Sequence, residues 1–144
     1  MMALDVLLLL LAATQVHAAG AADVALTGPE RIAAAKAAGF RVHGADMLNE
    51  CDAVADMISF ERQDLNGDGV GEIVVADGGA CYGATGAMFV VLRKIEGTWQ
   101  PILSAQGIMS PLPARHGGWR DIEIGGPGFG KMPVARWDGA RYLY

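Results

Sequence analysis

Residues 72–104 read EIVVADGGACYGATGAMFVVLRKIEGTWQPILS, and this stretch decides the fold. Its short apolar runs, each separated from the next by Gly-containing segments, are residues 72–76, 87–94 and 98–104. The dipeptide Glu96-Gly97 predicts a hairpin turn, because glycine adopts a positive φ at little cost. Residues 89–92, Phe-Val-Val-Leu, are apolar without alternation, which predicts a strand covered on both faces. The stretch therefore predicts an antiparallel β-meander.

The same pattern of short apolar runs separated by Gly-containing or Pro-containing segments continues on both sides of this stretch. Further strands are expected at residues 57–62, 119–124, 133–137 and 141–143. The order of residues 72–97 is echoed from residue 121 to residue 142: a strand, a Gly-rich loop, a strand and an acid-Gly turn, Asp138-Gly139. The echo indicates two adjacent blade-like sheets, one sheet made twice, or a chance likeness between hairpins.

The N-terminal part of the globular region favours helix. Thr27 followed by Glu30 is typical of a capping box, and Gly39 supplies a stop. We expect a short helix over residues 31–38 with Ile32 and Ala35 facing inward. Residues 45–54 are compatible with a second helix or with a loop. The expected fold class is α+β, mainly β: one or two N-terminal helices packed on an antiparallel β-meander sheet.

Residues 64–72 read DLNGDGVGE and carry the clearest chemistry in the chain. Oxygen-bearing side chains stand at positions 1, 3, 5 and 9 of this segment, namely Asp64, Asn66, Asp68 and Glu72. Calcium takes six to eight oxygen ligands, and Gly69 permits the sharp turn that gathers them, with the Val70 carbonyl as a further ligand. No Lys or Arg occurs inside the loop to neutralise its charge. The alternative is a metal-free turn in which Asp64 and Asn66 cap their own backbone.

An EF-hand is excluded, because the twelfth position of this segment is Val75 where an EF-hand has Glu, and because a predicted strand follows the loop in place of a helix. The segment from residue 59 to residue 76 instead resembles the calcium loop of FG-GAP and VCBS repeats. That resemblance implies Asp64, Asn66, Asp68, Val70 and Glu72 as calcium ligands. The family usually has Asp at the last of these positions, so direct ligation by Glu72 departs from its pattern. The chain is too short for a full propeller.

Two cysteines, Cys51 and Cys81, are the only ones in the chain. In an oxidising compartment a single pair favours a disulfide, whereas two buried free thiols are the alternative. Two thiols without C-x-x-C spacing do not indicate zinc or a redox centre.

Residues 1–18 have the shape of a cleaved signal peptide. Residues 6–13 are apolar but too short to cross a bilayer, and Val16 and Ala18 are the small residues that a cleavage site requires. A buried first helix or a retained anchor remains the alternative, since no Lys or Arg precedes the apolar run. We expect residues 19–144 to form a single periplasmic or secreted domain without a membrane span.

Charge and residue spacing narrow the functional class. Without residues 1–18 the chain keeps all 11 basic side chains and loses one of its 16 acidic ones, so acidic side chains still outnumber basic ones. Because binding to nucleic acid needs basic side chains that neutralise phosphates, nucleic acid is excluded as a partner. His43 and His116 do not stand in a spacing that is typical of a catalytic site. Asp121 and Glu123 fall on one face of a predicted strand and are interpreted as solvated acids. The Gly-rich segments 78–86 and 125–130 predict loops, the first flexible or lining a binding surface with Tyr82.

The sequence therefore predicts no enzyme. It predicts an exported binding or structural module that calcium stabilises and that recognises an unidentified protein or glycan through its Gly-rich loops. The alternatives are a carbohydrate-binding module using Trp99, Trp119 and Trp137, and a hydrolase.

Overall fold

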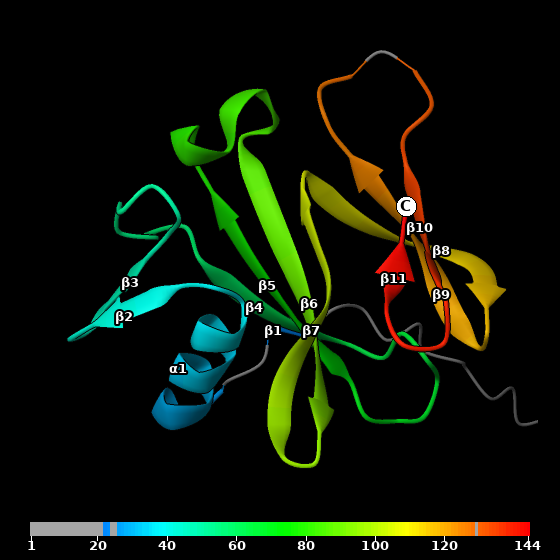
Figure 1. The fold of residues 1–144 in the computed structure, drawn as a ribbon, viewed down its shortest axis with the longest axis horizontal. Helices are drawn as coiled ribbons and strands as arrows, with labels where there is room; N and C mark the ends of the chain where they lie inside the picture. The colour runs from blue at the N-terminus through cyan, green and yellow to red at the C-terminus, as the bar shows by residue number, and fades with distance from the viewer. Residues whose placement is uncertain (1–21, 24–25, 129) are drawn as a thin grey trace, which may run out of the picture.

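The computed structural model describes residues 22–23, 26–128 and 130–144, and they form three layers (Figure 1). The first layer is helix α1 (Gly28–Ala37) with the hairpin of β2 (Arg41–His43) and β3 (Asp46–Leu48). A five-stranded antiparallel sheet forms the middle, and a four-stranded antiparallel sheet lies on its far side. The predicted class, α+β and mainly β with an N-terminal helix, is confirmed.

The middle sheet has the strand order β1-β4-β5-β6-β7. Its strands are β1 (Ala22–Asp23), β4 (Ser59–Gln63), β5 (Glu72–Gly78), β6 (Ala87–Ile95) and β7 (Thr98–Gln106). The second sheet has the order β11-β10-β9-β8, with strands β8 (Ile108–His116), β9 (Trp119–Gly125), β10 (Val134–Trp137) and β11 (Tyr142–Leu143). Each strand predicted from the sequence is present, with ends displaced by no more than two residues.

The two halves of the sequence echo form β5 to β7 and β9 to β11. Together with β4 and β8 they make two four-strand meanders, in separate sheets. Strand β8 was not predicted, because Pro111 and Pro113 argue against a strand. The structure accommodates both prolines because β8 is an edge strand, and its pairing with β9 shifts register between Pro111 and Arg115.

Two expectations near the N-terminus are settled by the structure. Of the two alternatives for residues 45–54, the helix is not formed: Gly44, with a φ of +63°, turns β2 into β3, and Cys51 lies in the loop that follows, as the other alternative had it. Ile32 is 38% exposed, whereas Ala34 and Ala35 are fully buried. On a helix with 100° per residue, Ile32 lies about 110° from the centre of that buried face. Its neighbour Arg31 is also exposed but lies over the Phe60 ring.

The middle sheet is buried on both faces, as predicted for residues 89–92. Val90 and Leu92 face α1, whereas Phe89 and Val91 face the second sheet. All four are at most 2% exposed. The core between the two sheets also holds Leu65 from the 64–72 loop, so this loop is part of the junction between the sheets.

The predicted signal peptide, residues 1–18, lies outside the described residues. Within the described part of the chain, no helix combines the length and the apolar character needed to cross a membrane.

Candidate functional site

The loop 64–72 connects β4 to β5 and is ordered by its own polar side chains. The Asp64 carboxylate accepts hydrogen bonds from the backbone N–H groups of Gly67 (2.6 Å) and Gly69 (3.0 Å). Asn66 accepts from the Asp68 N–H, and Asp68 accepts from the Val70 N–H at 2.7 Å. The predicted turn at Gly69 is present, with a φ of +83°. Asp64, Asn66 and Asp68 thus shape one tight surface loop.

The loop is anchored at Leu65, which is fully buried between the sheets. The Leu65 N–H donates to Glu72 Oε2 at 3.0 Å, and the Leu65 carbonyl accepts from the Arg120 N–H of β9 at 2.8 Å. Glu72 is 3% exposed and therefore lies beneath the loop. Burial raises the pKa of Glu72 above its ordinary value, the negative charges of Asp68 and Asp64 add to that, and the bond from Leu65 opposes it.

The donor chemistry of this loop fits a hard cation. Asp64 and Asp68 are exposed, and a carboxylate offers about four lone-pair sites, so their backbone hydrogen bonds leave capacity for a metal ion. Among the described residues, no three His, Cys, Asp or Glu side chains gather as a metal-binding group. Calcium would therefore draw on Asp64, Asn66, Asp68 and the Val70 carbonyl, while the buried Glu72 holds Leu65 in place.

The structure adds a positive charge that the sequence of the loop lacks. Arg115 of β8 donates to the carbonyl of Gly118 at 2.6 Å and to that of Leu65 at 3.4 Å. A methyl group on Gly67 would lie 3.8 Å from the Arg115 guanidinium. Arg115 therefore compensates part of the negative charge of the loop from the second sheet.

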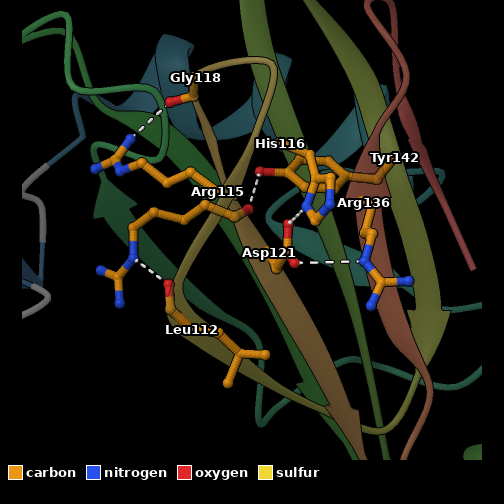
Figure 2. Close-up of polar contacts among 8 residues, drawn as sticks. Leu112, Arg115, His116, Gly118, Asp121, Arg136 and Tyr142 are labelled. Carbon is orange, nitrogen blue, oxygen red and sulfur yellow. Dashed lines mark hydrogen bonds and ion pairs between the residues drawn. The ribbon is translucent and has the colours of Figure 1, made fainter.

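A second polar cluster lies next to this junction, on the sheet that carries β9 (Figure 2). Asp121 is 2% exposed, and His116 Nδ1 lies 2.6 Å from its Oδ1. The Arg136 Nε lies 3.5 Å from Asp121 Oδ2. Asp121 is therefore a paired, buried carboxylate and not the solvated acid that the sequence suggested.

Tyr142 completes this cluster by donating its hydroxyl hydrogen to the carbonyl of Arg120 at 2.8 Å. Burial raises the pKa of Tyr142, and the charges of Glu72 and Asp121 contribute. A hydrolase would need His116 and a carboxylate in a concave site. His116 does lie beside Asp121, but its side chain is half exposed, and three cavities in the described part of the chain are lined by other residues.

The three tryptophans do not share one surface. Trp119 and Trp137 stack on each other with ring centroids 4.1 Å apart, and Arg93 lies over the Trp119 ring. Trp119 is only 6% exposed. Trp99 is instead partly buried and packs against the core on the α1 side of the middle sheet. A sugar platform built from all three side chains is therefore not formed.

The disulfide between Cys51 and Cys81 is present, with the two Cα atoms 5.9 Å apart. It joins the loop after β3 to the 3-10 segment η1 (Ala80–Thr85). Residues 80–85 thus form 3-10 turns with a kink at Tyr82 and Gly83, and the disulfide braces them, where the sequence suggested a flexible loop. Tyr82 of this segment is 2% exposed.

Tyr82 belongs to a buried polar group that sequence reasoning missed. Its hydroxyl donates to Asp77 Oδ2 at 2.7 Å, and the Asn49 amide donates to the same oxygen at 3.3 Å. Burial raises the pKa of Tyr82, and the hydrogen bond to Asp77 adds to that shift. The sequence offered one signal for this group: Asp77 is an acid that directly follows the apolar strand residues 73–76.

Comparisons of the chain with protein-family models, curated proteins and solved structures find no match. The fold and the loop define a class of protein: an α+β domain in which two antiparallel sheets pack together and an oxygen-rich loop lies at their junction.

Proposed function

We propose that this chain is an exported, non-catalytic binding or structural module and that calcium bound by the loop 64–72 stabilises it. The observation that carries the proposal is the position of the loop. Leu65 is buried between the two sheets, and its carbonyl accepts from the Arg120 backbone of β9. An ion that orders this loop would therefore stabilise the contact between the sheets.

Two features support this reading. The loop sequence resembles the calcium loop of FG-GAP and VCBS repeats, and the two four-strand meanders match the blade-like units that the sequence echo suggested. The disulfide and the signal-like residues 1–18 support a periplasmic or secreted location. Recognition of a protein or glycan partner would use the Gly-rich segments 78–86 and 125–130.

Calcium titration by calorimetry tests the proposal. Calcium sites of extracellular modules have Kd values on the order of 10⁻⁴–10⁻³ M, and we expect this range. Asp68→Asn keeps an acceptor for the Val70 N–H and removes one negative charge. We expect this change to weaken calcium binding at least about tenfold, since each ligand charge contributes strongly to affinity.

Asp138→Asn is the matched control. Asp138 accepts backbone hydrogen bonds from Ala140 and Arg141 in a surface turn, as Asp68 does from Val70, but it lies outside the 64–72 loop. Calcium binding should be unchanged in this variant. Wild-type protein that releases or absorbs no heat with calcium would sink the proposal and leave a metal-free turn.

A further inference from the structure

A cavity of about 170 Å³ lies between the C-terminal end of α1, the loop after β3 and Tyr82. It is far larger than the roughly 10–15 Å³ that one water requires, and smaller than the roughly 300 Å³ of drug-sized pockets. Its lining includes apolar side chains, Phe40 and Met88, and polar ones, Asn49, Glu50 and Tyr82. The cavity suits a small ligand with an apolar part and a polar end.

A buried carboxylate with spare hydrogen-bonding capacity lies next to this cavity. Asp77 is 3% exposed, and its Oδ1 has no hydrogen-bond partner among the described residues. Both partners of its other oxygen, Tyr82 and Asn49, line the cavity, as does Met88, which pairs with Asp77 across the sheet. Asp77 therefore lies immediately behind the polar end of the cavity.

Two of the four polar residues that line the cavity, Tyr82 and Glu50, present acceptors, whereas Asn49 and Ser104 retain donors. The Tyr82 hydroxyl gives its hydrogen to Asp77, so only its oxygen lone pairs remain for a ligand. Glu50 adds a carboxylate at the rim, and none of the described lining residues is basic. Arg41, next to Phe40 in the chain, is paired with Asp52. Acceptors and negative charge without a cation favour a ligand that donates hydrogen bonds and carries positive charge.

We propose that this cavity binds a small alkylammonium group, with the ammonium at Tyr82 and Glu50 and the alkyl chain against Phe40 and Met88. An ammonium has three N–H donors and no acceptor, which matches the acceptors of Tyr82 and Glu50. The disulfide holds the neighbours of Glu50 and Tyr82 together, so the walls are in place before a ligand enters. This site is separate from the calcium loop and extends the proposed function to a ligand class.

Titration of the full domain with n-butylammonium, followed by amide chemical shifts in NMR, tests this inference. We expect saturable shifts at residues lining the cavity. Asp77→Asn keeps the side-chain shape, removes the buried charge and should weaken binding at least about tenfold. Glu50→Gln removes an exposed charge and should weaken it by about threefold.

The matched control is Asp56→Asn, which removes an exposed carboxylate that does not line the cavity and should leave binding unchanged. Glu50→Gln decides the outcome if Asp77→Asn fails to fold, because Glu50 is exposed. Equal binding of the neutral probe 1-butanol, or binding that neither variant weakens, would overturn the inference.

A second probe, lysine blocked at both backbone ends, distinguishes two sources of the ammonium. Tighter binding of the blocked lysine would assign the cavity to a lysine side chain of a protein partner, and tighter binding of the free amine would assign it to a small molecule. If neither amine gives saturable shifts, the cavity does not bind ammonium groups. Each titration is run with calcium and with chelator, so that its result is independent of the loop 64–72.

Discussion

Short polar side chains control the backbone of the loop 64–72. Asp64, Asn66 and Asp68 each accept a hydrogen bond from an N–H no more than five residues away. Such bonds depend on residue type and spacing alone, which is why the turn was predictable. The contact between Arg115 and the Leu65 carbonyl of this loop was not predictable, because Arg115 lies on a strand of the other sheet.

Arg115→Gln should tighten calcium binding. By Coulomb's law in water, a unit positive charge and a divalent ion repel by about 1 kcal/mol at a separation of roughly 8 Å, and 1 kcal/mol corresponds to about fivefold in Kd. Calorimetry at low ionic strength measures the change, and raising the salt concentration should reduce it. Lys36→Gln removes the same charge from exposed Lys36 on α1 and is the control. Unchanged affinity in Arg115→Gln would contradict an electrostatic role for this side chain.

Asp121→Asn should lower the free energy of unfolding by about 1–3 kcal/mol, because a buried charge-assisted contact is lost. The contacts at stake are those with His116 and Arg136. Urea denaturation followed by tryptophan fluorescence measures the loss. Glu123→Gln, on the same strand but only half buried, should change stability by no more than about 0.5 kcal/mol. A similar small effect for Asp121→Asn would show that the cluster contributes little.

Among the elements, the strands that pair with near neighbours in the chain were recognised, and β8 was not. Prolines argue against a strand because they lack the N–H that a strand ladder needs. They are tolerated in β8 because its outer edge pairs with no other strand of the described sheet. Arg120 also donates to the carbonyls of Pro111 and Leu112 at 2.9 Å, which supports the irregular part of β8. Only the packing of the second sheet makes this segment a strand.

The link between the loop after β3 and η1 gives a prediction about the disulfide. Removing a cross-link across 30 residues should lower the free energy of unfolding by about 3–4 kcal/mol. Urea denaturation with and without reductant measures the difference in wild type. The double variant Cys51→Ser/Cys81→Ser should already be destabilised and should not respond to reductant. Labelling of free thiols in the unfolded, unreduced protein should detect none, and two reactive thiols would contradict the link.

For the whole molecule, calcium should raise the melting temperature. Ligand at ten times its Kd adds about 1.4 kcal/mol to stability, which is worth several degrees in a domain of this size. Differential scanning calorimetry in millimolar calcium and in chelator measures the shift, and Asp68→Asn should lose it. An identical melting temperature in the two conditions would mean that the loop does not connect metal binding to the contact between the sheets.

Local patterns alone determined the helix start at Thr27, the meander, the doubly covered strand at residues 89–92 and the turn at Gly69. They could do so because each depends on residues close together in the chain. Tertiary structure alone decided that Arg115 lies beside the loop 64–72, that His116 and Arg136 pair with buried Asp121, and that Asp77 lies behind a cavity. Those contacts join residues that are far apart in the chain or lie on separate strands, and only the pairing of the strands and the packing of the layers bring them within reach.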